Sequence, residues 1–483
     1  MVTIERTMRI LLVKPSPTLG SILGLQGFSL LEPLELGLLA AAIPRRHEVR
    51  VLDLRLARWP RRAFVQMLRR FAPEMIGFTG YTHEASANKA LAAVARRERP
   101  DATIIVGGHH ATVAPDDYDL ELFDAVVRGE GTGPFRTIVA AVERGEGISP
   151  ARMVRVRGVT PDPADARAWP TYPDPATLPA PRRDLWDSRS YRSVWLCEEM
   201  PRWSTIYPRV SLVRSSYGCK MSCTFCIVPY LCNGEHRPRP ADLVADEIAT
   251  APADHIYFVD DENFIDPGHG WQLADALASR NVRKRYFAWT RATTVNRHPD
   301  LFRRWREIGL DAVFIGFEFT TDRELKSVHK GGTTAGNEEA VERLRAMGIA
   351  VHAAFMILPE WTRDDFMRLR EYVRALPPLQ CSFTVCTPSP GTPDYEAIRD
   401  RIWIDRPYDL YDCMHPLTPT TLSLRDFARL YAEQAAEGLS KVPLRIKKHL
   451  TLPWDMVRVN VAGVRYARGF RNLYRDYPRE LWD

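Results

Sequence analysis

The sequence lacks any apolar run long enough to span a membrane. Its first apolar run, Ile10 to Val13, is short and follows Glu5 and Arg6, so we expect a strand there rather than a signal peptide. An excess of charge of one sign is also missing, because 66 basic and 60 acidic residues leave only +6 over 483 residues. That balance gives no reason to expect a nucleic-acid partner, and the whole pattern is typical of a cytoplasmic protein.

Cysteine is scarce as well: eight residues in 483 exclude a disulfide framework. Five of them show no metal-site spacing, and we expect most of them to be buried, reduced thiols: Cys197, Cys232, Cys381, Cys386 and Cys413. The chain is 45% hydrophobic and 26% charged, as in ordinary globular proteins. It is too long for one compact core, so we expect two or three domains.

The other three cysteines lie close together in the run SYGCKMSCTFC at 216–226. Cys219, Cys223 and Cys226 follow a CxxxCxxC spacing, and Phe225 precedes the last of them. Three thiolates at this spacing can bind three irons of a [4Fe-4S] cluster and leave the fourth iron open, whereas most electron-transfer clusters use four cysteines. The spacing therefore indicates that the open iron takes part in chemistry.

Zinc is the alternative metal that these cysteines could bind. Structural zinc sites usually come as CxxC pairs or Cys/His sets that supply four ligands. The nearest further candidates are Cys232 and His236, and their spacing does not match a zinc motif. The sequence therefore favours an iron–sulfur cluster.

Residues 1–150 are expected to form an open parallel sheet, because apolar runs alternate with segments of helical periodicity. The expected strands are 8–14, 48–53, 75–79, 103–106 and 124–128, and the expected helices are 31–45, 61–71 and 83–97. This order predicts a doubly wound, Rossmann-like α/β domain, which binds ligands at the carboxyl ends of its strands. Candidate binding residues at those ends are Thr79, Gly80, Tyr81, Gly107, Gly108, His109 and Glu130. Glycines there let the backbone approach a large flat ligand or a phosphate.

A second series of β/α units follows, and it predicts a partial (β/α)6 barrel over 206–400. The expected strands are 211–214, 255–259, 286–289, 312–318, 351–357 and 382–385. Polar residues recur at their carboxyl ends, the rim where β/α barrels form active sites: Asp260, Asp261, Glu262, Arg291, Glu318 and Glu360. A solvated strand end is the commoner explanation for any one of them, and only their convergence near the cysteine loop favours a site.

Two further regions complete the expected organisation. Residues 151–205 are rich in proline without periodicity and predict an ordered connector between domains. Residues 401–483 are helical by pattern, and 441–475 carry nine Lys or Arg against one Asp. Four apolar residues share one face of that segment: Trp454, Val457, Val461 and Val464. Such a helix either lies on an anionic membrane or covers the barrel opening with its basic face in water.

Together these residues resemble the radical S-adenosylmethionine (SAM) superfamily, in particular its subgroup with an N-terminal cobalamin-binding domain. The resemblance covers about residues 8–400, and the cysteine motif with Phe225 is its specific element. The other segments that carry it are VDDENF at 259–264, GFE at 316–318, TPSPGT at 387–392, RPRP at 237–240, LEPL at 31–34, GG at 107–108 and RGEG at 128–131. The subgroup's cobalt-binding DxHxxG motif is absent, since the loop 14–20 holds no histidine.

The resemblance implies three cofactors: a [4Fe-4S] cluster on the three cysteines, SAM, and cobalamin without a protein histidine on cobalt. It implies that Asp260 or Asp261 holds the SAM ammonium, and that Arg291 and Glu318 contact its ribose or carboxylate. The strand-end residues of the first domain would then lie against cobalamin. Tyr230, just after the cysteine loop, is a candidate for the base that takes a substrate proton, with a packing role as its alternative.

The implied activity is radical methylation of an unactivated carbon in a natural product or lipid, as in hopanoid C-3 methylase-like and related secondary-metabolism enzymes. One alternative uses the same radical without methylation, for dehydration of a sugar diol, cyclisation or ring rearrangement, with a vestigial cobalamin domain. Another is a cobalamin-binding sensor without catalysis, against which the cysteines and the six β/α units argue. The implied partners are a small-molecule or lipid substrate and a reductant such as flavodoxin or ferredoxin. Peripheral membrane contact follows only if the basic helix lies on a membrane rather than over the barrel opening.

Overall fold

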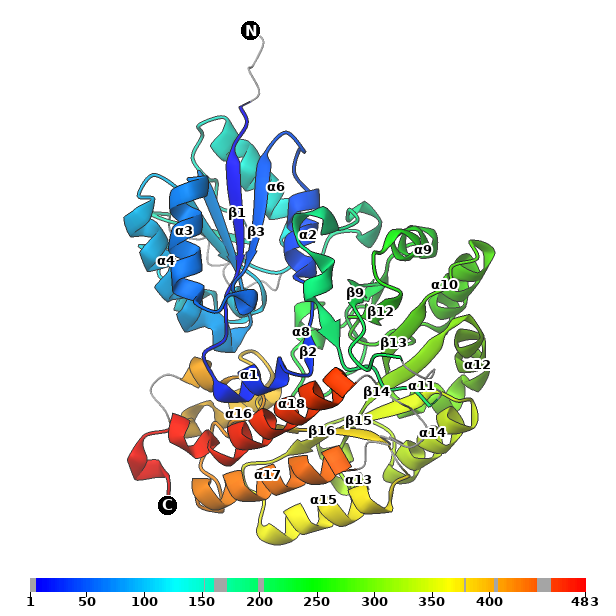
Figure 1. Cartoon of the computed structure of the whole chain (residues 1–483). Coiled ribbons are helices and arrows are strands. Elements are labelled where there is room, and N and C mark those ends of the chain that lie inside the picture. The colour runs from blue at the N-terminus through cyan, green and yellow to red at the C-terminus, as the bar shows by residue number, and fades with distance from the viewer. Residues whose placement is uncertain are drawn as a thin grey trace. The chain divides into compact units, whose positions relative to one another are not determined.

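A computed structural model describes residues 6–151, 153–159, 172–198, 204–377, 379–403, 407–440 and 453–483 (Figure 1). Contacts divide the chain into two compact units. The first comprises Met1–Thr18, Pro33–Asp187 and Tyr230–Asn233, and the second comprises Leu19–Glu32, Ser188–Pro229 and Gly234–Asp483.

The first unit contains a six-stranded sheet in the order β3-β1-β4-β5-β6-β7. Its strands are β1 (Arg9–Lys14), β3 (Glu48–Asp53), β4 (Met75–Thr79), β5 (Thr103–Gly107), β6 (Ala125–Val127) and β7 (Val154–Val156). The first five run parallel, and β7 pairs antiparallel with β6. The chain places β3 on one side of β1 and β4 on the other, so the strand order reverses at β1, where sheets of this kind bind ligands.

Helices cover both faces of this sheet, as expected for a doubly wound domain. The helices are α2 (Leu34–Ala41), α3 (Pro60–Phe71), α4 (Ala85–Glu98), α5 (His109–Val113) and α6 (Thr132–Glu143). Successive residues of β1 point to opposite faces: Leu11 packs in a core with Phe64 of α3, and Leu12 in a core with Phe135 of α6. The predicted Rossmann-like fold is confirmed, and its five predicted strands lie where the sequence places them.

The connector expected over 151–205 is only partly irregular. Val154–Val156 forms the edge strand β7, so the first sheet extends past residue 150. Residues 152, 160–171 and 199–203 of the connector lie outside the described ranges. The proposed division at residue 150 thus stays a prediction, while the first sheet continues beyond it.

The second unit is built on six parallel strands in the order β16-β15-β14-β13-β12-β9. They are β9 (Val210–Val213), β12 (His255–Phe258), β13 (Arg285–Thr290), β14 (Leu310–Glu318), β15 (Ala350–Ile357) and β16 (Gln380–Val385). Their spatial order follows the chain, with β9 and β16 as the two edges. This is the partial barrel that the sequence predicts.

Helices between these strands supply the outer layer of the partial barrel. They are α9 (Ala241–Thr250), α10 (Pro267–Ser279), α11 (Ala292–Arg297), α12 (Pro299–Ile308), α13 (Asp322–Ser327), α14 (Thr334–Ala346) and α15 (Arg363–Ala375). α12 shows why they pack there: Leu301, Phe302 and Trp305 are buried on one face, and Trp305 donates a hydrogen bond to the carbonyl of Gly270. Such an apolar stripe on an amphipathic helix drives its packing on the sheet.

The C-terminal part is helical, as predicted, with α16 (Pro393–Ile398), α17 (Leu424–Ser440) and α18 (Pro453–Arg471). α18 packs between α17 and α1 (Gly20–Leu25), an early segment that belongs to this unit (Figure 1). A side chain at Gly24 or Gly27 would meet Tyr466 or Ala462 of α18, so glycine allows the close approach. Among the described helices, none is both long and apolar enough to cross a membrane.

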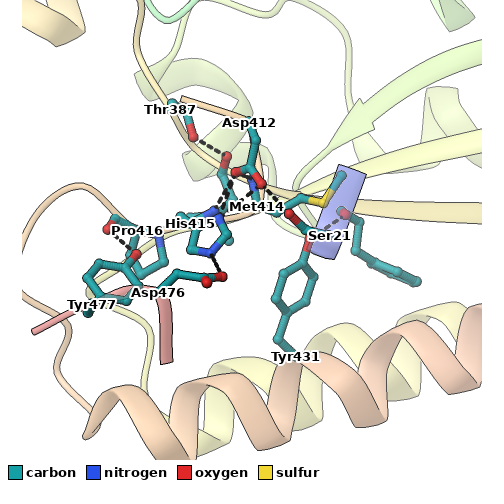
Figure 2. A network of polar contacts seen from close by, with 11 residues as sticks. Ser21, Thr387, Asp412, Met414, His415, Pro416, Tyr431, Asp476 and Tyr477 are labelled. Carbon is teal, nitrogen blue, oxygen red and sulfur yellow. Dashed lines mark hydrogen bonds and ion pairs between the residues drawn. The ribbon is translucent and has the colours of Figure 1, made fainter. Parts of the chain in front are cut away.

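A buried polar network joins three segments of this unit (Figure 2). Asp412 accepts a hydrogen bond from Ser21 of α1 at 2.6 Å and another from the imidazole of His415. The second ring nitrogen of His415 lies 3.1 Å from Asp476, in the short helix η9 (Leu473–Asp476). Burial lowers the pKa of His415, but the two carboxylates outweigh it and raise the pKa to about 9. His415 is therefore charged at neutral pH.

Candidate active site

The carboxyl end of β12 holds the start of the cysteine loop. This loop lies between β10 (Ser216–Tyr217) and β11 (Arg237–Pro238), which pair antiparallel. The buried Asp260 accepts hydrogen bonds from the Ser215 amide and from the hydroxyls of Ser215 and Ser216, at 2.6–3.1 Å. Burial raises the pKa of Asp260 although these donors lower it. Asp261 accepts from the Gly218 amide at 2.9 Å, so two consecutive acids fix the entry to the loop.

A second set of contacts fixes the far side of the cysteine loop. The Thr224 amide donates to the carbonyl of Val328, and its hydroxyl donates to Asp394 at 3.1 Å. The thiol of Cys223 lies 3.7 Å from the carbonyl of His329. The loop is therefore anchored on both sides.

The three thiols line one cavity of about 180 Å³, partly open to solvent, at the carboxyl ends of β12, β13 and β14. Its lining residues are Cys219, Met221, Cys223, Phe225, Cys226, Val228, Pro229, Asp261, Glu262, Trp289, Thr290, Arg291, Phe314, Gly316, Glu318 and Lys330. Burial raises the pKa of the Cys219 thiol to about 11 and that of Cys226 to about 12. Metal ligation would deprotonate these thiols, since the thiolate is the binding form.

Three buried polar atoms of the lining have no hydrogen-bond partner within the part of the chain that the structure describes: Glu262 Oε2, Thr290 Oγ1 and Arg291 Nε. The other carboxylate oxygen of Glu262 accepts from Thr294 at 2.5 Å, and burial raises the pKa of this acid. Buried polar atoms without partners are costly. Orphans of both signs therefore fit a cavity built for a polar, zwitterionic ligand.

An ion pair closes one side of the cavity. Lys330 Nζ lies 2.6 Å from Glu318 Oε1, and both side chains are largely buried. Glu318 has a left-handed backbone, φ +63°, after a register shift at the end of β14. A side chain at Gly316 would collide with both charged groups, so this glycine makes room for the pair.

Arg291 places a second cation beside the thiols. Its Nη1 lies 3.8 Å from the sulfur of Cys223, and the side chain is buried. Within the described ranges no three His, Cys, Asp or Glu side chains are arranged to hold a single metal ion. The metal-ligand role of the three cysteines stays a prediction, supported by their shared cavity.

The structure brings together most of the site residues that the sequence predicts for the partial barrel. The cavity gathers the three cysteines with Phe225, Asp261, Arg291 and Glu318. Asp260 does not line it, because its oxygens accept from Ser215 and Ser216. Tyr230 lies in the short helix α8 (Val228–Leu231), and contacts group it with the first unit.

Lys330 was not predicted as a site residue. It follows α13 in the run His-Lys-Gly-Gly, away from any strand end, so no pattern marks it. Glu262 was visible as a strand-end acid, but its orphaned oxygen and its place in the lining emerge only from the structure.

The first unit carries its own polar group at the carboxyl ends of β1 and β4. Lys14 is buried at the end of β1, with its ammonium 3.3 Å from Glu84 and 3.4 Å from Glu35. The same ammonium lies 4.7 Å from the centre of the Tyr81 ring. Tyr81 is 57% exposed and stacks on His83 at 6.1 Å. An exposed aromatic ring thus lies at the point where the strand order reverses.

The predicted glycines of this edge let its loops approach one another. A side chain at Gly108, with φ +96°, would meet the hydroxyl of Thr79, and one at Gly80 would meet Asn88. His109 is half-buried beside Tyr81, and desolvation lowers its pKa to about 4, so it is neutral at pH 7. Glu130 accepts hydrogen bonds from the amide and hydroxyl of Thr132. The β1 loop offers no histidine to a ligand at this edge.

Two family models match this chain. Residues 20–139 match the B12 binding domain, and residues 213–373 match the Radical SAM superfamily. The second range contains the cysteine loop and all strand ends that line the cavity.

Two curated proteins illustrate the relationship. Hopanoid C-3 methylase of Methylococcus capsulatus is 28% identical, over 98% of this chain and 86% of that protein. Anaerobic magnesium-protoporphyrin IX monomethyl ester cyclase of Synechocystis sp. is 25% identical, over 86% of this chain and 82% of that protein.

One solved structure extends the comparison to three dimensions. The radical S-adenosylmethionine methyltransferase TsrM from Kitasatospora setae, with cobalamin and a [4Fe-4S] cluster bound, aligns with a TM-score of 0.61 and 16% identity. The alignment covers 96% of this chain and 99% of that chain. At this identity the likeness shows a shared fold.

Proposed function

We propose that this chain, which belongs to the radical SAM superfamily and carries an N-terminal B12 binding domain, methylates an unactivated carbon of a small molecule or lipid. The family matches confirm the predicted membership, the order of the two domains and the assignment as an enzyme. The observation that carries the proposal is the cavity in which three thiols face orphaned polar atoms at the ends of parallel strands.

The three cysteines are proposed to hold a [4Fe-4S] cluster. When bound, the cluster and SAM supply a 5′-deoxyadenosyl radical, and cobalamin supplies the methyl group that a second SAM restores. The chain's part is to anchor the loop through Asp260, Asp261 and Thr224, and to keep the site partly closed to water. Phe225 lines the cavity between the second and third cysteine ligands.

The charged lining residues are proposed to orient SAM as a zwitterion. Asp261 and Glu262 suit its ammonium, since Glu262 has an oxygen free of partners within the described residues. Arg291 and Lys330 suit its carboxylate, because charge-assisted contacts of this kind are strong and directional. Glu318 holds Lys330 in place at 2.6 Å and remains a candidate contact to the ribose.

The carboxyl edge of the first unit is proposed to contact cobalamin through Thr79, Gly80, Tyr81, Gly107, Gly108, His109 and Glu130. Support comes from the exposed Tyr81 ring and from the glycines, which let neighbouring loops of this edge approach one another closely. No histidine of the β1 loop is available to the cobalt, so we propose binding without a protein histidine ligand.

A second candidate function is radical cyclisation without methylation. The similarity to the Synechocystis cyclase, over 86% of this chain, favours it. The similarity to the hopanoid methylase covers more of this chain, 98%, at higher identity, and so methylation leads. A sensor without catalysis has no use for the cavity beside the cysteines.

The partners follow from the reaction. We propose a cytoplasmic enzyme that receives electrons from a flavodoxin or ferredoxin, because the cluster must be reduced. Tyr230 is proposed as the base that takes a substrate proton, and a Tyr230→Phe variant would then cleave SAM normally but form little product.

The proposal is tested anaerobically with the full-length protein. The chain is reconstituted with iron, sulfide and cobalamin and desalted, and its bound corrin is recorded by absorbance. SAM and dithionite are then added, and 5′-deoxyadenosine and S-adenosylhomocysteine are assayed together. Retained corrin with both products supports methyl transfer.

The same assay separates the alternatives. With 5′-deoxyadenosine alone and no retained corrin, cyclisation or rearrangement would replace methylation. Retained corrin without SAM cleavage, in protein that carries its cluster, would favour the sensor.

A further inference from the structure

We infer that the outward face of α18 is a docking surface for an anionic lipid bilayer. This surface, termed here the α18 face, consists of Trp454, Val457, Val461 and Val464 together with Arg458, Arg465, Arg468 and Arg471. The inference concerns where the protein binds and does not depend on the reaction at the cysteine loop.

The apolar part of the α18 face is exposed and continuous along the helix. Trp454 is 81% exposed, Val464 68%, Val457 54% and Val461 45%. At 3.6 residues per turn these positions lie within an arc of about 80° and extend over about 15 Å. Leu439 of α17 is also exposed, and it lies beside α18 at Gly463. Exposed apolar stripes of this kind mark contact surfaces.

The opposite side of α18 is buried against neighbouring helices. Ala462, Tyr466 and Phe470 are buried, and Phe470 packs on Tyr431 of α17 with ring centres 4.4 Å apart. Gly24 and Gly27 of α1 approach the same side, at Tyr466 and Ala462. Figure 1 shows α1 beside α18. α18 therefore already has a buried face that packs on its neighbours. The exposed apolar stripe is a second, separate face of the same helix.

The exposed charges of α18 are all positive: Arg458, Arg465, Arg468 and Arg471. The helix has a single acid, Asp455, whose carboxylate accepts from the Thr205 hydroxyl at 2.6 Å and the Ile206 amide at 2.9 Å. Apolar side chains with tryptophan at one end and arginines alongside are the pattern of a helix lying in a membrane interface.

Charge also decides between a bilayer and a second copy of this chain. The valine spacing alone would suit packing against another helix. Two α18 faces brought together would oppose arginine with arginine, and the α18 face offers no acid to offset this. An anionic lipid surface complements the same charges, and each arginine near it favours binding about fivefold.

The test is flotation of the full-length, cluster-reconstituted protein with vesicles. Phosphatidylcholine vesicles are compared with vesicles that also contain phosphatidylglycerol, at low and high salt. We expect binding that needs phosphatidylglycerol and weakens with salt, since salt screens the attraction. Absence of phosphatidylglycerol-dependent flotation at low salt would overturn the inference.

Matched variants locate the surface. Trp454→Ser and the double variant Val461→Asp/Val464→Asp should lose binding, and Arg465→Gln/Arg468→Gln should bind about 25-fold more weakly. Trp59→Ser is the control, because Trp59 is 63% exposed on the first unit. Equal losses for Trp454→Ser and Trp59→Ser would contradict the assignment. A dimer in sedimentation velocity that Val461→Asp/Val464→Asp dissociates, without vesicle binding by the native protein, would identify a second copy as the partner.

The variants must leave the fold and the reaction unchanged for this comparison. Iron content and SAM cleavage in detergent-free buffer serve as the check, since none of the substituted residues lines the cavity. A variant that keeps both but no longer floats supports the inference.

Discussion

The imidazole of His415 lies between two carboxylates, 3.0 Å from Asp412 and 3.1 Å from Asp476 (Figure 2). Asp412 also accepts from Ser21 and from the amides of Met414 and His415. One charged ring thus joins α1, the segment after β16 and the residues after α18. Removing either side of a buried pair is costly, because the remaining charge loses its partner.

This network predicts a loss of stability at alkaline pH. The pKa of His415 is raised from 6.5 to about 9, so its contribution is complete below pH 6.5 and is lost as pH rises through 9. The shift corresponds to roughly 3 kcal/mol. Chemical unfolding of the native protein and of His415→Gln, from pH 6 to 10, should show a difference that shrinks with pH. Parallel curves would contradict the prediction, and His298→Gln, at the half-exposed start of α12, is the control.

Substitution of any one cavity cysteine should abolish the cluster. Cys219→Ala, Cys223→Ala and Cys226→Ala are each expected to retain little iron and to cleave no SAM, because a cubane cluster needs all three thiolates. Iron, sulfide and zinc analysis after anaerobic reconstitution checks this. Cys381→Ala, on β16 and outside the cavity lining, should behave like the native protein. Bound zinc in the native protein, in place of iron, would refute the cluster assignment.

Lys330 should determine the affinity for SAM. Lys330→Met removes a cation from the cavity, and losing a charge-assisted contact should raise the KM for SAM roughly 10-fold or more. Lys330→Arg should recover part of it. The matched control is Lys326→Met, at an exposed position of α13. If both methionine variants change the KM equally, Lys330 does not contact SAM.

Arg291 should tune the cluster potential. If the cysteines hold the proposed cluster, the Arg291 guanidinium, 3.8 Å from the Cys223 sulfur, would stabilise its more negative, reduced state. In Arg291→Gln the midpoint potential should fall by roughly 60 mV, which is about 1.4 kcal/mol for a one-electron couple. An anaerobic redox titration followed by electron paramagnetic resonance measures it. Arg297→Gln, exposed at the end of α11, should leave the potential unchanged, and an unchanged value in Arg291→Gln would show that the guanidinium does not act on the cluster.

Sequence patterns predicted the scaffold well, because buried parallel strands appear as apolar runs between turns. β3 and β4 have the predicted bounds, Glu48–Asp53 and Met75–Thr79. β7 was missed because Val154–Val156 is very short and lies in a proline-rich region. Its strand character depends on pairing with β6, which no local pattern reports.

The sequence predicts that the site lies at the carboxyl ends of the barrel strands, but it does not predict which polar residues there line the cavity. Asp260 and Asp261 are consecutive, and the sequence gives no means to tell that one holds serine hydroxyls while the other lines the cavity. Lys330 lies at the cavity in an ion pair with Glu318, whose backbone is left-handed at the end of β14. A register shift of this kind depends on the packing of β14 against β15 and leaves no periodic signal.

The close packing of α1 on α18 also bears on how the second unit folds. Residues near position 24 must meet residues near position 466, so the unit cannot be completed until the last helices have been synthesised. A fragment starting at residue 206 would lack α1. It would expose Tyr466 and Ala462 on the side of α18 against which Gly24 and Gly27 pack. Independent expression of the catalytic unit would therefore require residues 19–32 to be supplied as well, for example by circular permutation that joins them to the C-terminal helices.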